Sequence, residues 1–242
     1  MACVIAVTSG KGGTGKTSIT GGTAASLSLM GRRVLCIDMD IGLRNLDISL
    51  GLNDRALMDF SDVALGRCPL ARAAVSHPEL KNLSLLTAPM SLPAGLTPDK
   101  VRALLDTART LYDYILIDSP AGLGPGFRLA ACGADRALVV ATNDASSLRD
   151  AQRTVAELER VRQVHLVMNR IQPRLLRKLR TTIDDAMNAA GLPLIGVVPE
   201  DPQVILCANQ GIPLTSRGHR GAALACWNIA QQLEGRQVPV MR

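Results

Sequence analysis

The segment Gly10-Lys11-Gly12-Gly13-Thr14-Gly15-Lys16-Thr17-Ser18, near the amino terminus, fits the pattern G-x-x-x-x-G-K-[ST] of the phosphate loop. The apolar residues 3–7 before it predict a buried strand, and the small and apolar residues 18–29 after it predict a helix. Strand, glycine-rich loop and helix in this order are the context in which the pattern binds phosphate. The segment therefore predicts an α/β fold with a nucleotide at this loop.

The residue types of the loop assign a role to most of its positions. Its glycines allow successive backbone N–H groups to turn toward the β- and γ-phosphates, and the following helix presents its positive end to the same anion. Lys16 is expected to hold the phosphate oxygens, and the Thr17 hydroxyl is expected to bind Mg²⁺. Lys11 is unusual, because the ordinary loop has one lysine. It can reach its own phosphates or those of a nucleotide held by a second copy of the chain.

Length and composition limit the architecture. The chain has 242 residues, 47% of them hydrophobic, which is enough for one large α/β domain. No apolar run is long enough to span a bilayer and no secretion signal precedes the first strand, so we expect a cytoplasmic protein. Six scattered cysteines without a C-x-x-C pair predict neither a disulfide framework nor a zinc site.

Apolar runs alternate with helical patterns along the whole chain. We expect strands at 3–8, 33–38, 83–88, 114–118, 137–142, 164–169 and 194–198. We expect helices near 18–30, 98–111, 147–162, 175–190 and 221–234. Such alternation predicts a mainly parallel central sheet with helices on both faces, the fold class of P-loop NTPases. No domain boundary is visible, so we expect one domain over 1–242, with a core of 1–235 and a short tail of 236–242.

Carboxylates follow two of the predicted strands. Asp38 and Asp40 lie at the end of strand 33–38, and Asp118 ends strand 114–118. Ligands of a parallel sheet bind at the carboxyl ends of its strands, so these side chains are expected to face the phosphate loop. An Asp in this position holds Mg²⁺ through water. Taken by themselves, Asp38 and Asp40 are equally suited to capping the following turn.

Two later strand ends are candidates for recognition of a base. Asn169 and Arg170 close strand 164–169, and an Asn amide offers both a donor and an acceptor to a base edge. Pro199, Glu200 and Asp201 follow strand 194–198, where a routine turn is the competing interpretation.

Three of these segments resemble one family. GKGGTGKTS resembles the deviant phosphate loop of the MinD/ParA family of ATPases, DMDIGLRNLD at 38–47 resembles the first switch of its MinD branch, and DSPAG at 118–122 resembles the second switch. The resemblance implies ATP and Mg²⁺ as ligands. It also implies that Lys11 reaches the partner's nucleotide across a dimer interface, and that Asp40 orients the attacking water.

The resemblance also completes the list of expected site residues. The catalytic residues are Lys11, Lys16 and Asp40; the nucleotide-binding residues are Gly10, Lys11, Gly12, Gly13, Thr14, Gly15, Lys16, Thr17, Ser18, Asn169, Arg170, Pro199, Glu200 and Asp201. The metal-binding residues are Thr17, Asp40 and Asp118, and the switch residues are Asp38, Gly42, Arg44, Asp118 and Gly122.

The family further implies an ATP-dependent homodimer, slow hydrolysis, a MinC-like effector and a MinE-like activator in division-site placement. Segment 142–150 departs from the family, because Asp144-Ala145 replaces an expected Pro-Glu and Gln152 replaces an acid. The tail at 236–242 is too short for the amphipathic helix by which MinD enters membranes, so we expect weak membrane association, peripheral at the inner face of the plasma membrane.

Two alternatives remain open. One is a ParA-like DNA segregation ATPase, for which the net charge of +6 and the basic residues between 170 and 180 are suited. The other is a regulator of flagellar placement. The basic run consists of Arg170, Arg174, Arg177, Lys178 and Arg180, and as a solvated helix face it needs no ligand.

Overall fold

A computed structural model describes residues 2–238 of the chain. Eight strands form one sheet in the order β3-β4-β2-β5-β1-β6-β7-β8, and every pairing except β3 with β4 is parallel. The strands are β1 (Cys3–Thr8), β2 (Val34–Asp38), β3 (Val75–Ser76), β4 (Leu83–Leu86), β5 (Tyr114–Asp118), β6 (Arg136–Ala141), β7 (Gln163–Ile171) and β8 (Leu194–Pro199). The mainly parallel sheet confirms the predicted fold class.

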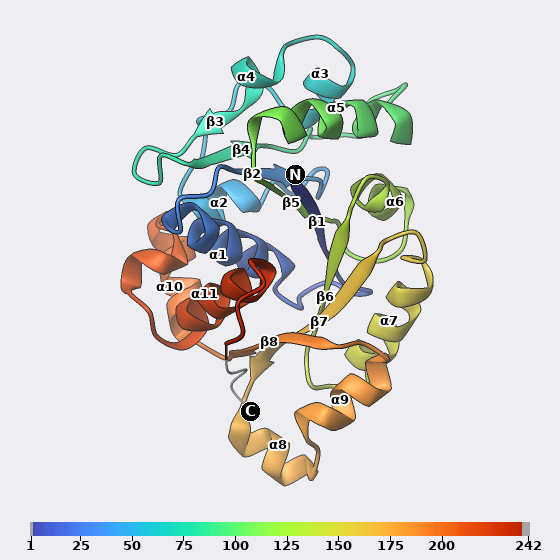
Figure 1. The fold of residues 1–242 in the computed structure, drawn as a ribbon, viewed down its shortest axis with the longest axis vertical. Coiled ribbons are helices and arrows are strands. Elements are labelled where there is room, and N and C mark those ends of the chain that lie inside the picture. Colours follow the sequence, from blue (N-terminus) through green and yellow to red (C-terminus); the bar gives the residue numbers. More distant parts are fainter. Residues whose placement is uncertain (1, 239–242) are drawn as a thin grey trace.

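Helices cover both faces of this sheet (Figure 1). One face carries α1 (Lys16–Leu29), α2 (Leu46–Leu50), α10 (Pro202–Gln210) and α11 (Gly221–Leu233), with the 3-10 turn η1 (Leu214–Arg217). The other face carries α3 (Phe60–Ala64), α4 (Leu70–Ala73), α5 (Pro98–Leu111), α6 (Pro125–Ala131), α7 (Ala145–Ala156) and α9 (Ile183–Ala190). In the described residues 2–238, no helix is long and apolar enough to cross a bilayer.

The buried strands and helix faces form three apolar clusters, one on the α1/α11 side and two on the opposite side. The central strand β1 lies between β5 and β6, and its residues Val4, Ile5 and Val7 are fully buried. Burial on both faces explains why the parallel strands are apolar along their length. The sheet therefore holds the carboxyl ends of β1, β2 and β5 together at one edge, where the phosphate loop begins.

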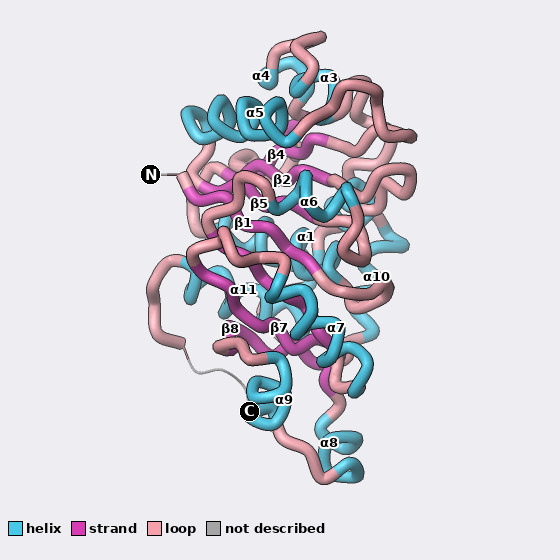
Figure 2. Tube along the Cα trace, turned by 90° about the vertical axis from the view of Figure 1, so that its right-hand side faces the viewer, coloured by secondary structure: helices cyan, strands magenta, loops and turns pink. Residues whose placement is uncertain are grey.

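The sequence prediction is wrong about the segment 175–190. It forms two helices, α8 (Pro173–Leu179) and α9, separated by Arg180, whose φ of +52° ends α8 in the left-handed region. Thr182 then starts α9 with a capping box, in which its side chain accepts from the Asp185 N–H and Asp185 bonds back to Thr182. α8 has no buried residue and extends from one end of the molecule (Figure 2).

Several short elements are absent from the sequence prediction: α2, α3, α4, α6, α10, η1 and the edge strand β3. The helix expected at 147–162 begins two residues earlier and ends at Ala156. Of the tail expected at 236–242, residues 239–242 lie outside the described part of the chain.

Candidate functional site

The phosphate loop connects the end of β1 to the start of α1, as the motif predicts. Gly15, the residue before α1, has a φ of +91°, and a Cβ there would lie 2.2 Å from the Asn169 Nδ2. A side chain is therefore excluded on both backbone and steric grounds. A Cβ on Gly13 would meet no atom within 4 Å, so the outer side of the loop is open. The loop fits a phosphate group against the first N–H groups of α1.

Lys16 lies inside this site rather than on its surface. Its side chain is buried, and its Nζ donates to the Ser9 Oγ at 3.1 Å. Burial lowers the pKa of the Lys16 ammonium, while the nearby carboxylates of Asp118 and Asp40 oppose that shift. A partly desolvated cation in a glycine-rich cradle is suited to a polyanionic ligand.

Asp38 and Asp118 are partners across the β2–β5 pairing, and both are 1% exposed. Burial raises the pKa of Asp118 to about 7, with Asp38 adding to the rise and the Thr17 hydroxyl and Lys16 opposing it. Burial also raises the pKa of Asp38 to about 6, against the hydrogen bonds that Asp38 accepts from the backbone. Two adjacent buried carboxyls favour a bound cation, because a cation stabilises both in the ionised form.

Asp38 shapes the loop that follows β2. Its two carboxylate oxygens accept from the backbone N–H groups of Asp40 at 2.9 Å and Leu46 at 3.1 Å. Asp40 is half-buried; burial raises the pKa of its carboxyl and Lys16 lowers it. The structure thus brings Asp40 to the Lys16 side of the site, with Asp38 bonded to the backbone of the loop that carries Asp40.

The side-chain oxygens near the phosphate loop are suited to a Mg²⁺ ion that is held together with a nucleotide. Among the described residues, they do not form a metal site made of protein ligands alone. Across residues 2–238, no three His, Cys, Asp or Glu side chains are grouped so that they could hold a metal ion by themselves. The Thr17 hydroxyl acts to lower the pKa of Asp118, the Thr20 Oγ1 lies 3.3 Å from the Asp118 Oδ1, and Asp40 lies near Lys16. Mg²⁺ retains several waters and is held by one or two protein oxygens together with phosphate oxygens, which this donor set matches.

The remaining switch residues lie on two loops at the same edge. The N–H of Gly42 donates to the Pro89 carbonyl at 3.1 Å, and Arg44 donates through Nη2 to the Thr87 Oγ1 at 2.8 Å. Gly122 has a φ of +80°. The Cβ of its neighbour Ala121 would lie 3.8 Å from a Cβ placed on Gly12 of the phosphate loop. The loop of Gly122 is therefore next to the phosphate loop, whereas Gly42 and Arg44 are bonded to residues 87–89, after β4.

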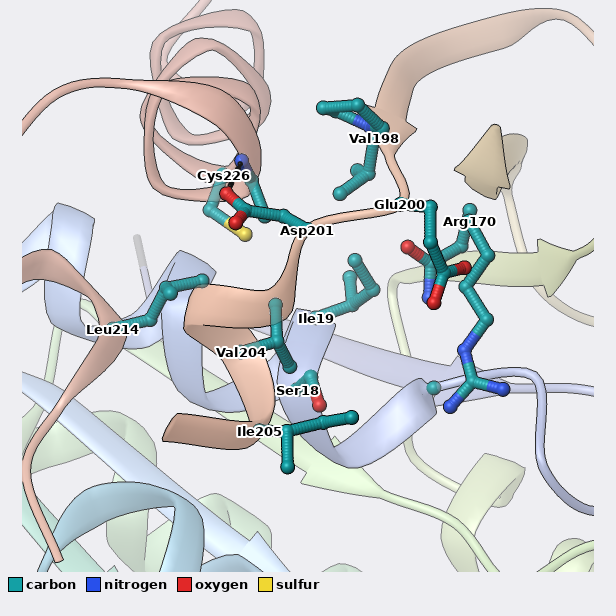
Figure 3. A pocket seen from close by; sticks show the side chains of 14 residues that line it. Ser18, Ile19, Arg170, Val198, Glu200, Asp201, Val204, Ile205, Leu214 and Cys226 are labelled. Atoms are coloured by element: carbon teal, nitrogen blue, oxygen red, sulfur yellow. Dashed lines mark hydrogen bonds between the residues drawn. The ribbon is translucent and has the colours of Figure 1, made fainter. Parts of the chain in front are cut away.

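A pocket beside the phosphate loop is suited to a base (Figure 3). Its lining includes the predicted Ser18, Asn169, Arg170 and the connector of residues 199–201. Asn169 is buried, and its amide nitrogen donates to the Thr14 carbonyl at 2.7 Å, which fixes the side chain against the phosphate loop. Apolar walls come from α10, α11 and η1. A pocket with apolar walls and a few polar groups next to a phosphate site is suited to a nucleotide base.

Sequence reasoning missed those apolar walls. The residues concerned are Val204, Ile205, Leu214, Ala222 and Cys226. The sequence does carry a signal for α10, because Asp201 followed by Pro202 has the pattern of an N-cap followed by proline at the first helical position. Ser9, the hydrogen-bond partner of Lys16, was also missed, because it precedes the motif.

Lys11 is separate from the Lys16 site. Its Nζ donates to the Asp144 Oδ1 at 2.8 Å and to the Ser146 Oγ at 3.0 Å, and its side chain is 33% exposed. Burial acts to raise the pKa of Asp144, but the hydrogen bonds from Lys11, Ser146 and Thr142 prevail and hold it well below its usual range. Asp144 is also the N-cap of α7, so the lysine is attached to the start of that helix.

Comparisons with known proteins agree with this geometry. Residues 5–214 match the family model of the CobQ/CobB/MinD/ParA nucleotide binding domain. The septum site-determining protein MinD of Helicobacter pylori is 41% identical over 249 residues, covering 98% of this chain and 92% of that protein.

Two solved structures show the same fold. A MinC:MinD cell division protein complex of Aquifex aeolicus contains a chain with a TM-score of 0.93 and 36% identity, covering 100% of this chain and 99% of that one. MinD of Pyrococcus horikoshii OT3, complexed with Mg-ADP, has a TM-score of 0.85 and 28% identity, covering 97% of this chain and 96% of that one. The chain therefore belongs to the MinD branch of the MinD/ParA family of nucleotide-binding ATPases.

Proposed function

We propose that residues 1–235 act as one ATP-driven switch in division-site placement, whose product is an oligomeric state rather than a small molecule. Mg²⁺ and ATP bind at the phosphate loop, and the base enters the pocket next to Asn169. Lys16 and Thr17 hold the phosphates and the metal shell, with Asp118 as the second support. Asp40 positions the water that attacks the γ-phosphate, and the bound metal supplies neutralisation of the charge that develops there.

The observation that carries this proposal is the separation of the two lysines. Lys16 is buried among the site carboxylates, whereas Lys11 is at the surface and bonded to α7. A lysine of the motif that is not directed at its own phosphates is available to a nucleotide across an interface. ATP then favours a dimer of two chains, each completing the other's site, and hydrolysis dissolves that dimer.

The experiment compares the wild type with Lys11→Ala and Lys16→Ala by light scattering, with Mg-ATP and with Mg-ADP. Wild type is expected to dimerise with ATP only. Lys11→Ala is expected to bind ATP and stay monomeric, while Lys16→Ala loses ATP binding itself. If Lys11→Ala dimerises like the wild type, the cross-interface role of Lys11 is wrong.

The MinC:MinD complex of Aquifex supports a MinC-like protein as the effector of this chain. A MinE-like activator that accelerates hydrolysis follows from the same family. Affinity capture by ATP-loaded, but not ADP-loaded, chain from cells of the source organism tests both partners, and equal recovery with either nucleotide contradicts a switch.

One observation favours the alternative of DNA binding. α8 carries exposed cations, and Arg174, Arg177, Lys178 and Arg180 make no ion pair among the described residues. Sedimentation with duplex DNA and, in parallel, with anionic liposomes separates the two surfaces. We expect weak association with both at about 0.15 M salt, since exposed charge is screened over about 8 Å there. Strong ATP-dependent binding to DNA favours the segregation ATPase.

A further inference from the structure

A single carboxylate holds the amino-terminal ends of two helices. Asp201 lies in the connector between β8 and α10, and its Oδ1 accepts from the Gln203 N–H at 2.9 Å. Its Oδ2 accepts from the Ala222 N–H, also at 2.9 Å. Asp201 is therefore the N-cap of α10 and, across 21 residues of chain, satisfies a first-turn donor of α11 as well. The residue at the N-cap position of α11, Arg220, contributes no side-chain cap.

These two helices are facing walls of the base pocket. Val204 and Ile205 of α10 and Ala222 and Cys226 of α11 all line it. Figure 3 shows the carboxylate of Asp201 turned toward α11, while Glu200 and Arg170 lie on the other side of the pocket. Asp201 thus contributes its backbone to the pocket and its side chain to the support behind the pocket.

The chain is adapted to this contact at a second position. Gly221, the first residue of α11, has a φ of +51°, and a Cβ there would lie 2.1 Å from the Asp201 Oδ2. Any side chain at 221 would occupy the space of the carboxylate. The connector is also fixed on its other side, because the Glu200 N–H donates to the Ile171 carbonyl of β7 at 3.1 Å.

We propose that Asp201 is a positioning residue that sets the separation of α10 and α11 and thereby the fit of the base in the pocket. The amino-terminal ends of α10 and α11 both carry a partial positive charge and would repel each other when they lie close together. The Asp201 carboxylate lies between them and offsets this repulsion. Without it, the exposed Gln203 N–H and the N–H of the buried Ala222 lose their acceptor, and the walls of the pocket separate. The inference rests on the proposed nucleotide site and adds to it the device that holds the base.

Two ligands that share phosphates and differ in the base provide the test. Mg-tripolyphosphate contacts only the phosphate loop, whereas Mg-ATP also uses the pocket, and calorimetry gives the dissociation constant of each. Asp201→Ala is expected to weaken ATP binding about tenfold, the loss that one to two hydrogen bonds bring, and to leave tripolyphosphate binding within about twofold. Gly221→Ala is expected to weaken ATP binding in the same selective way.

Two control variants separate this effect from general destabilisation. Gly218→Ala changes a glycine with a φ of +86° and no atom within 4 Å of a Cβ, so it adds backbone strain without touching the carboxylate. Asp185→Ala removes a carboxylate that accepts the Thr182 N–H at the start of α9, away from the base pocket. Both are expected to bind ATP and tripolyphosphate like the wild type.

Equal losses of both ligands in Asp201→Ala would overturn the proposal, because the residue would then support the whole site. Unchanged ATP binding in Asp201→Ala or Gly221→Ala would also overturn it. The proposed function fails in a different way, when the wild type binds neither ligand, or binds ATP no more tightly than tripolyphosphate.

Discussion

Asp38 and Asp118 lower the stability of the ligand-free fold and at the same time favour the binding of a cation. Both are buried, side by side, without a cation in hydrogen-bond contact among the described residues, and burial raises their pKa values to about 6 and about 7. Such an arrangement destabilises the ligand-free fold and favours the metal-bound one. It predicts that ligand binding and stability are linked in this chain.

The pH dependence of stability follows from those two carboxyls. Their folded-state pKa values lie above the unfolded value of 3.8, so the folded state binds more protons and loses stability as pH rises from about 4 to about 7. The ligand-free wild type is expected to melt several degrees higher near pH 5.5 than near pH 8, since each pKa unit corresponds to about 1.4 kcal/mol. Calorimetry at both pH values measures this difference.

The matched variant is Asp38→Asn/Asp118→Asn, in which neither group titrates. Its melting temperature is expected to vary less with pH between those values than that of the wild type. A variant whose pH dependence equals that of the wild type would assign the effect to other groups.

Asp40 is expected to act in hydrolysis and not in binding. It is half-buried beside Lys16, while the phosphate loop and the start of α1 are expected to make most of the contacts to the phosphates. Asp40→Ala is therefore expected to bind ATP within about threefold of the wild type and to lose at least about 100-fold in single-turnover hydrolysis, the range typical of a general base. Hydrolysis at the wild-type rate would remove Asp40 from the mechanism, and Asp47→Ala, in the first turn of the following helix α2, is a control.

At the residue scale, the sequence is most informative where a motif and a strand end coincide. Lys16, Thr17 and Asp118 lie at fixed offsets from strand ends, so pattern and position together indicate their site. Ser9, Thr20 and Asp144 were not assigned roles, because each acts through a contact with a segment distant in sequence or outside the pattern: the Thr20 Oγ1 lies 3.3 Å from the Asp118 Oδ1, across 98 residues. Those contacts depend on tertiary structure, which no single motif contains.

At the scale of elements, α7 is attached to the phosphate loop at two points. Asp144 binds Lys11, and a Cβ on Gly10 would lie 2.6 Å from the Asp150 Cβ, so the loop and the helix are in close contact. The position of α7 is therefore expected to depend on whether Lys11 is bound to Asp144. A change at Lys11 on nucleotide binding would then reach a partner that binds near α7.

Asp144→Asn tests this coupling. Asn retains the N-cap acceptor for α7 but removes the charge that holds Lys11, so the melting temperature is expected to stay within about 2 °C of wild type, as for other exposed ion pairs. The ATP concentration at half-dimerisation is expected to fall up to about fivefold, because Lys11 no longer has to leave a partner.

The matched control is Asp113→Asn, which breaks the Arg33–Asp113 pair of 2.8 Å on another part of the surface. It is expected to leave half-dimerisation unchanged. If Asp144→Asn dimerises at the same ATP concentration as the wild type, the ion pair has no role in assembly.

The break between α8 and α9 shows why an element was mispredicted. Apolar and small residues recur with helical period from 175 to 190, and that pattern predicts one helix. The signal that separates them is local: Thr182 with Asp185 three residues later, a capping box inside the run. The capping box starts a new helix inside the periodic pattern, and the chain passes between the two helices through one left-handed residue, Arg180.

Arg180→Gly is expected to stabilise the protein. A non-glycine residue at a φ of +52° carries a backbone penalty that glycine avoids, and the gain is about 0.5–1 kcal/mol, or about 2 °C in melting temperature. Arg177→Gly, inside α8, is the control and is expected to lower the melting temperature by a similar amount. A lower melting temperature for Arg180→Gly would show that its side chain makes a stabilising contact.

At the scale of the whole molecule, the parallel sheet and its helical layers were predictable because burial on both faces leaves continuous apolar strands. The short elements α2, α3, α4 and β3 were not predictable, since segments of two to five residues carry too little periodicity. The candidate site was predictable in its phosphate half, where a motif exists, and only partly in its base half, where α10 and α11 meet through Asp201.

Assembly is the property of the whole molecule that a melting experiment can reveal. A ligand that binds only the folded state stabilises it by mass action, and a dimer of folded chains adds a dependence on protein concentration. With a non-hydrolysable ATP analogue, each tenfold rise in protein concentration adds about 1.4 kcal/mol per dimer. For chains of this size we expect a rise of about 1–2 °C in melting temperature.

With Mg-ADP, the melting temperature is expected to exceed that of the ligand-free protein but to be independent of protein concentration. Lys11→Ala with the analogue is expected to behave like the wild type with ADP, because it binds nucleotide without the cross-interface lysine. A wild-type melting temperature that is independent of protein concentration with the analogue, over a range in which ligand is saturating, would show that ATP stabilises a monomer and that the switch operates without a dimer.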